Sequence, residues 1–124
     1  MGQVLLADDE PALLNLFRKV LEQEGYQVVT ADDGALALKL VEGGGVELLV
    51  TDIEMPNMTG IELLRRVRQY APELPVIIMT GGSALKTVPE AYGLGVTQFL
   101  LKPVLPVQLV TTVRQVLARR HPEG

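Results

Sequence analysis

The segment 46-VELLVT-51 is a short, mostly apolar run, followed at once by Asp52 and then, from Gly60 to Tyr70, by apolar side chains at helical spacing. The chain contains five such runs, which are Val4–Ala7, Gln27–Ala31, Val46–Thr51, Val76–Thr80 and Thr97–Leu101. Their β-branched content and lack of polar alternation are typical of parallel strands that are covered on both faces. We therefore predict five strands in one parallel sheet.

Each run precedes a segment with helical periodicity. The predicted helices are Pro11–Gln23, Gly34–Glu42, Gly60–Tyr70, Ser83–Gly93 and Pro106–Arg120. The apolar stripes expected to face the core are Leu13, Leu16, Phe17, Val20 and Leu21; Leu36, Leu38, Leu40 and Val41; Ile61, Leu64 and Val67; and Leu109, Val113, Val116 and Leu117. The segment 83–93 has the weakest support, because Pro89 removes a helical hydrogen bond unless it lies in the first turn. The alternation predicts an α/β fold with a doubly wound five-stranded parallel sheet, right-handed crossovers and five helices on its two faces.

Length and composition limit the possible functions. The 124 residues carry a net charge of −4, and 48% of them are hydrophobic, so we expect one domain over residues 1–124 with a substantial core. The acidic balance argues against direct nucleic-acid binding by this domain. The chain has no cysteine, which excludes disulfides and Cys-ligated metals. No apolar run suits a membrane span and no signal segment precedes Asp8, so we expect a cytoplasmic protein without membrane contact.

Polar side chains follow four of the predicted strands. Asp8, Asp9 and Glu10 follow the first, Asp52 the third, Thr80 ends the fourth, and Lys102 follows the fifth. Each alone has an ordinary structural explanation, such as helix capping or a solvated surface charge. In a parallel sheet, however, the carboxyl ends of the strands meet at one edge, where ligands bind near the reversal of strand order. We therefore expect these side chains to converge.

Converging carboxylates need a compensating charge. An all-oxygen set with few ligands suits Mg²⁺, which keeps several waters and shares its shell with phosphate. Lys102 adds a second positive charge and Thr80 a hydroxyl. Carboxylate, metal, lysine and hydroxyl are the groups that phosphoryl transfer requires.

Several other activities lack their motifs. The chain has no phosphate-binding P-loop, and no G-x-G-x-x-G follows the first strand, so nucleotide and dinucleotide binding are disfavoured. The single histidine, His121, lies in a charged C-terminal tail, which favours a solvated side chain over a catalytic base. A Ser-His-Asp arrangement therefore has no support.

Four segments, spread over nearly the whole chain, resemble the receiver domain of two-component response regulators. The matching pieces are Asp8-Asp9-Glu10, the segment 50-VTDIEMPNMTG-60, Thr80 after 75-PVIIM-79, and 95-GVTQFLLKP-103. The resemblance implies a flavodoxin-like sheet with strand order 2-1-3-4-5, the order that receiver proteins share. It also implies that Asp52 accepts a phosphoryl group from a phosphohistidine on a sensor kinase or phosphotransfer protein, forming an aspartyl phosphate.

The resemblance assigns further roles. Mg²⁺ would be ligated by Asp9, by Asp8 chiefly through water, by Asp52 and by the backbone carbonyl of Glu54. Lys102 and the hydroxyl of Thr80 would contact the phosphoryl oxygens.

Thr80 and Phe99 would form the conformational switch, with Phe99 rotating into space that Thr80 vacates. Pro56 and Gly60 would set the loop after Asp52, and Pro103 would follow a cis peptide bond.

The sequence departs from the family pattern at a few positions. Val104 stands where the family often has Phe after Lys-Pro, and Gly81-Gly82 replaces the more frequent small side chain after the switch hydroxyl. Together with Pro89, the two glycines alter the region of the fourth helix, which belongs to the face of the fourth helix, fifth strand and fifth helix where the resemblance implies that the signal is read out. Phe99 on an apolar strand also has a plain interpretation as a core residue.

Three functions remain open at this point. The leading one is a phosphorylation-activated switch that transfers the phosphoryl group to itself and dephosphorylates slowly, without turning over an outside substrate. An aspartate-nucleophile Mg²⁺-dependent phosphohydrolase is a second, and an interaction domain without phosphorylation is a third. The downstream effector is unknown, and a homodimer through the face made by the fourth helix, fifth strand and fifth helix is possible. The chain is either a stand-alone protein or a piece of a longer regulator or hybrid kinase.

Overall fold

The computed structural model describes residues 2–120, so His121 lies outside the described residues. Five parallel strands form one sheet in the order β2-β1-β3-β4-β5. The strands are β1 (Gln3–Ala7), β2 (Gln27–Ala31), β3 (Val46–Asp52), β4 (Val76–Thr80) and β5 (Gln98–Leu101). The helices are α1 (Pro11–Gln23), α2 (Gly34–Glu42), α3 (Gly60–Tyr70), α4 (Val88–Gly93) and α5 (Pro106–Arg120), with a 3-10 helix (Gly82–Thr87) before α4. The predicted fold class and strand order are therefore confirmed.

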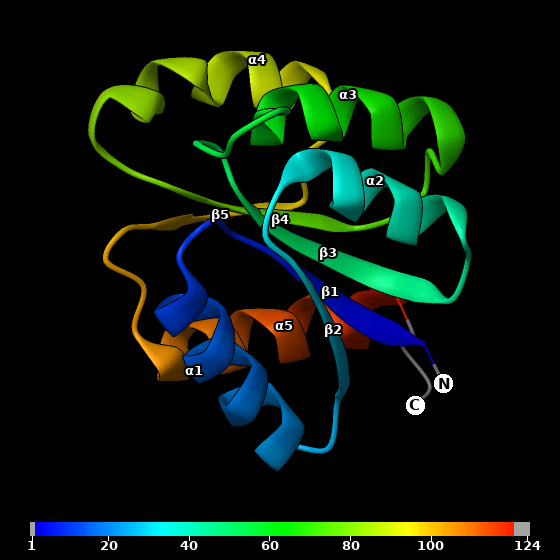
Figure 1. Ribbon diagram of the computed structural model, residues 1–124, viewed down its shortest axis with the longest axis vertical. Helices are drawn as coiled ribbons and strands as arrows, with labels where there is room; N and C mark the ends of the chain where they lie inside the picture. The colour runs from blue at the N-terminus through cyan, green and yellow to red at the C-terminus, as the bar shows by residue number, and fades with distance from the viewer. Residues whose placement is uncertain (1, 121–124) are drawn as a thin grey trace.

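The helices cover both faces of the sheet. Figure 1 shows α1 and α5 on one face and α2, α3 and α4 on the other. The central strands are buried on both sides because their alternate side chains enter two separate cores. In β1, Val4 and Leu6 pack on the α1–α5 side, whereas Leu5 and Ala7 pack on the α2–α3–α4 side. This explains why the strands show continuous apolar runs in the sequence.

The two outer strands differ from the expectation of complete burial. β2 and β5 are only partly buried, because each has a neighbouring strand on one side only. In β5, Gln98 and Leu101 are exposed. The residue Thr97, predicted to begin this strand, precedes it, although its N–H still donates to the carbonyl of Val76 over 2.8 Å.

Helix boundaries follow local start signals. Pro11 begins α1, the Asp33 carboxylate accepts a hydrogen bond from the N–H of Leu36 over 2.8 Å at the start of α2, and the Thr59 hydroxyl accepts one from Glu62 over 3.2 Å at the start of α3. These caps satisfy amides that have no partner inside the helix.

The predicted helix 83–93 is divided. A 3-10 helix precedes α4, and Pro89 lies at the second residue of α4, where its missing N–H costs no helical hydrogen bond. The prediction of one continuous helix was therefore wrong, while the condition placed on Pro89 is met.

Two residues of the predicted apolar stripes do not face the core. Leu16 in α1 and Leu36 in α2 are exposed, by 45% and 41%. In α1 the buried stripe is centred on Phe17 and Leu21, and Leu16 lies on its margin because successive residues turn by about 100°. In α2 the buried residue next to Leu36 is Ala37.

No helix among residues 2–120 has the length and apolar content that a membrane crossing needs.

Candidate functional site

The polar residues singled out in the sequence meet at the carboxyl edge of the sheet. Asp8 follows β1, Asp52 ends β3, Thr80 ends β4 and Lys102 follows β5. The strand order reverses between β1 and β3, which is where doubly wound sheets bind ligands. Carboxylate oxygens of Asp8, Asp9 and Asp52 lie within 4.8 Å of one another.

Asp8 is a buried carboxylate with only part of its hydrogen-bonding capacity used. Its Oδ1 accepts a hydrogen bond from the N–H of Glu10 over 2.9 Å, while its buried Oδ2 has no partner among the described residues. Burial raises the pKa of Asp8 from 3.8 to about 6; the Glu10 amide opposes this rise, and the Asp52 carboxylate adds to it. An unpartnered buried carboxylate oxygen is costly, so this atom is available for a cation.

Asp52 is held by one hydrogen bond on each oxygen. Oδ1 accepts from the N–H of Ile53 over 2.7 Å, and Oδ2 accepts from the Lys102 ammonium over 2.8 Å. The Asp52 side chain is 7% exposed and that of Lys102 is 29% exposed, so solvent reaches the pair from the lysine side.

The ammonium of Lys102 is in a strongly acidic environment. Burial on its own would lower the pKa of Lys102, but the hydrogen bond to Asp52 and the carboxylates of Asp8 and Glu10 outweigh burial and raise it above its ordinary value. Lys102 is therefore a permanent cation beside Asp52. The peptide bond from Lys102 to Pro103 is cis.

Thr80 and Phe99 lie on neighbouring strands and project to the same face of the sheet. Thr80 pairs with Leu101, and Phe99 pairs with Ile78, so alternation places both side chains on the α2–α3–α4 side. The Thr80 hydroxyl is buried and has no hydrogen-bond partner among residues 2–120. Phe99 is partly buried, and its ring meets the edge of Tyr92 in α4 with centroids 5.1 Å apart.

The loop between β3 and α3 lies tightly against the end of β3. The N–H of Gly60 donates to the carbonyl of Ile53 over 2.8 Å, and a Cβ atom at Gly60 would lie 2.1 Å from the carbonyl oxygen of Asp52. Only glycine fits there. The loop also contains Pro56, whose carbonyl accepts from the N–H of Met58 over 2.7 Å, and an exposed Glu54.

The sequence did not indicate every group at this edge. The amides of Glu10 and Ile53, which hold Asp8 and Asp52, leave no signal in residue type because any residue supplies an N–H. The sequence did not predict the contact between Tyr92 and Phe99 either. That contact depends on which residues of α4 face β5, and α4 begins at Val88, later than the predicted helix.

Comparison with known proteins agrees with this geometry. A sequence model of the response regulator receiver domain matches residues 4–114. The chain is 38% identical over 120 residues to the alginate biosynthesis transcriptional regulatory protein AlgB of Pseudomonas putida, covering 96% of this chain and 27% of that protein. It is 38% identical over 122 residues to the transcriptional regulatory protein CpxR of Escherichia coli, covering 98% of this chain and 51% of that protein. The chain thus spans about a quarter to a half of the length of these relatives.

Solved structures show the same likeness over the full length. A CheY-like receiver domain protein from Methanospirillum hungatei superposes with a TM-score of 0.93 at 30% identity, covering 100% of this chain and 99% of that one. A receiver domain protein from Clostridium thermocellum gives a TM-score of 0.88 at 27% identity, covering 100% of both chains. Fold, motif order and relatives agree, and the chain belongs to the receiver domain family of two-component response regulators.

Proposed function

We propose that Asp52 is the phosphoacceptor and that residues 1–124 act as one receiver unit, switched by phosphorylation of this carboxylate. The observation that carries the proposal is the pair of Asp52 and Lys102, joined over 2.8 Å at the carboxyl edge of the sheet. The ammonium lies where oxygens of a phosphoryl group on Asp52 would form, so it can stabilise their charge without rearrangement of the backbone. The unpartnered hydroxyl of Thr80 at the same edge is the second donor.

The residues present fit a divalent cation. Asp8, Asp9 and Asp52 carry three negative charges against one positive charge on Lys102, which leaves two charges for a dication to balance. All the candidate ligand atoms are oxygens, and within residues 2–120 the buried Oδ2 of Asp8 has no hydrogen-bond partner, which leaves it free for Mg²⁺. Asp8, Asp9, Asp52 and the backbone carbonyl of Glu54 would hold the ion. When bound, Mg²⁺ supplies positive charge to the phosphoryl oxygens during transfer.

The chemical step uses the chain's own nucleophile. A carboxylate oxygen of Asp52 attacks phosphorus, an O–P bond forms, and the P–N bond of the donor phosphohistidine breaks with its electron pair going to the imidazole nitrogen. Lys102 moves from the carboxylate to a phosphoryl oxygen. The reaction is stoichiometric, with slow self-dephosphorylation, so the protein is a switch and turns over no separate substrate.

The response begins at Thr80. Its hydroxyl is buried and has no hydrogen-bond partner in the described part of the chain, so a new anion on Asp52 gives it an acceptor. Movement of Thr80 toward that anion vacates space on the face that Phe99 shares, and Phe99 turns inward to fill it. The aromatic ring thereby carries the change from the site to β5 and α4.

The proposed partners follow from the chemistry and the family. The donor is a sensor histidine kinase or a histidine phosphotransfer protein. The relatives are named as transcriptional regulators and are longer than this chain, which supports an effector outside it and no direct nucleic-acid binding by the receiver. The α4–β5–α5 face exposes Tyr92 and Leu101 by 65% and 63%, which supports homodimerisation there. We place the protein in the cytoplasm.

A small donor with a P–N bond tests the acceptor role. Intact mass is measured after incubation with phosphoramidate, with and without Mg²⁺, for the wild-type protein and Asp52→Asn. We expect one phosphoryl adduct that requires Mg²⁺ and is lost in the variant. An adduct that persists in Asp52→Asn would move the acceptor elsewhere, and release of many phosphates per protein would favour the phosphohydrolase.

A further inference from the structure

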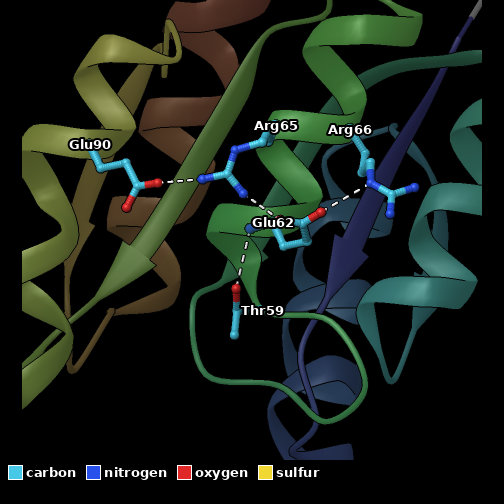
Figure 2. Close-up of polar contacts among 5 residues, drawn as sticks. All are labelled: Thr59, Glu62, Arg65, Arg66 and Glu90. Carbon is cyan, nitrogen blue, oxygen red and sulfur yellow. Dashed lines mark hydrogen bonds and ion pairs between the residues drawn. The ribbon is translucent and has the colours of Figure 1, made fainter.

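Helix α4 is short, and polar contacts from α3 fix it in place. Figure 2 shows Arg65 of α3 between Glu62 on its own helix and Glu90 on α4, with ion pairs to both. The carboxylate of Glu62 also pairs with Arg66 over 3.0 Å, and the backbone N–H of Glu62 donates to the hydroxyl of Thr59. Arg65 therefore comes to Glu90 from a side-chain network that is already ordered on α3.

A second arginine of α3 fixes the far end of α4. Arg68 donates from Nε to the carbonyl of Leu94 over 2.9 Å and from an Nη to the carbonyl of Gly95 over 2.8 Å. A third bond, of 2.7 Å, reaches the carbonyl of Leu74 before β4. These carbonyls follow the last turn of α4, where helical partners are missing. Both the middle and the end of α4 are thus tied to α3.

Tyr92 projects from this fixed helix onto the ring of Phe99. The two rings meet edge to face, with centroids 5.1 Å apart and planes at 65°. Tyr92 is 65% exposed, so it contributes little to the core, and among residues 2–120 its aromatic interaction is the one with Phe99. Edge-to-face pairs add favourable energy beyond the area they bury.

Phe99 packs against the core cluster on the α2–α3–α4 face, which includes small side chains. Ala84 in the 3-10 helix and Ala91 in α4 are buried in the same core cluster that Phe99 packs against. The proposed switch moves Phe99 inward when Thr80 shifts, and such a movement would take its ring away from Tyr92. In its observed, partly buried position, which the proposed switch treats as the outer one, Phe99 has Tyr92 as an aromatic partner.

We propose that Tyr92 is a positioning residue that stabilises the outer position of Phe99. Tyr92 thereby sets the equilibrium between the outer and inner positions of Phe99 in the unphosphorylated protein. This inference rests on the proposed function, because it assumes that Phe99 is the switch aromatic. Loss of one edge-to-face contact corresponds to a change of roughly 2- to 12-fold in the equilibrium between the two positions of Phe99. Because ligand binding and the equilibrium are linked, a phosphoryl analogue that selects the inner position should bind more tightly by the same factor.

The test combines a spectroscopic signal with an affinity. The chain has two phenylalanines, so fluorophenylalanine labelling gives one ¹⁹F signal for Phe99 and a reference signal for Phe17, which is 2% exposed in the opposite core. The signals are followed during titration with beryllofluoride, a non-covalent phosphoryl analogue, in the presence of Mg²⁺. The proteins compared are wild type, Tyr92→Ala, Tyr92→Phe and the control Tyr70→Ala. Tyr70 is an exposed tyrosine at the end of α3, and its hydroxyl donates to the carbonyl of Glu42.

We expect beryllofluoride to bind Tyr92→Ala about 2- to 12-fold more tightly than wild type. Tyr92→Phe keeps the ring and should restore the wild-type affinity, and Tyr70→Ala should match wild type. Equal affinity in Tyr92→Ala and wild type, with the Phe99 signal moving in both, would overturn the role of Tyr92 alone. A wild-type Phe99 signal that does not move when beryllofluoride binds would instead refute the switch on which the inference rests.

Discussion

Replacing Asp8 with asparagine should stabilise the metal-free protein, although it removes a predicted metal ligand. The folded protein holds the Asp8 proton more tightly than the unfolded chain, because burial raises the pKa of this carboxyl from 3.8 to about 6. The stability associated with the protonated form is fully present below pH 3.8 and is lost as the pH rises through 6. Asparagine keeps the acceptor for the Glu10 amide and cannot ionise.

The magnitude follows from the two pKa values. At pH 4.5 ionisation of Asp8 lowers the free energy of unfolding by about 1 kcal/mol, and at pH 7.5 by about 3 kcal/mol. The variant should recover these amounts, with about 4 °C in Tm for each kcal/mol in a domain of this size. Mg²⁺ should reverse the order: at about 1,000 times its Kd it stabilises the wild-type protein by about 4.1 kcal/mol, and it should stabilise the variant much less.

The assay is urea unfolding at pH 4.5 and 7.5, first with EDTA and then with Mg²⁺. Asp32→Asn is the matched control, because Asp32 is an exposed carboxylate that follows β2 at the same edge of the sheet. A variant that is less stable than wild type at pH 7.5 in EDTA would refute the reasoning. A gain that is equal at both pH values, or equal in Asp32→Asn, would do the same.

Three other substitutions test separate parts of the site. Gly60→Ala should lower the free energy of unfolding by more than about 2 kcal/mol, because its Cβ would lie 2.1 Å from the Asp52 carbonyl oxygen. Gly43→Ala is the control in the same urea titration and should change this free energy little, because its Cβ would have no contact closer than 3.5 Å. Thr80→Val removes a buried hydroxyl that has no partner among residues 2–120, so it should leave the free energy of unfolding unchanged or raise it by up to about 1 kcal/mol. It should also abolish the movement of the Phe99 ¹⁹F signal on phosphorylation. A normal movement would show that Thr80 is not part of the switch. Lys102→Ala should still form an adduct but uncouple it from the Phe99 signal, and a fully coupled response would show that its role was misassigned.

The parts of the fold that depend on local signals could be predicted from the sequence. Pro11, Gly34 and Gly60 begin helices at the predicted residues. Proline suits the first turn because its missing N–H has no helical partner there, and the capping side chains accept hydrogen bonds from the free amides of the first turn. The strand-end residues could be placed together for a different reason. A parallel sheet brings its carboxyl ends to one edge whatever the side chains are, so Asp8, Asp52 and Lys102 had to converge.

The remaining features depend on tertiary contacts. Pro89 is a local signal for the start of α4, but the position of α4 beside α3 depends on the arginines of α3 that bind it, which no local pattern reveals. The exposure of Leu16 depends on where the core lies relative to the stripe, and the spacing alone cannot decide between the two margins. The contact of Tyr92 with Phe99 joins two elements through side-chain directions, so the sequence carried no signal for it.

Locating the phosphoryl group tests the central claim most directly. The protein is treated with acetyl phosphate and Mg²⁺, the acyl phosphate is reduced with borohydride, which converts the modified aspartate to homoserine, and the peptides are sequenced by tandem mass spectrometry. Homoserine should appear at position 52, depend on Mg²⁺ and be absent from Asp52→Asn. Homoserine at Asp8 or Asp9 instead, or a stable phosphoester on a hydroxyl side chain, would contradict the assignment of Asp52 as the phosphoacceptor.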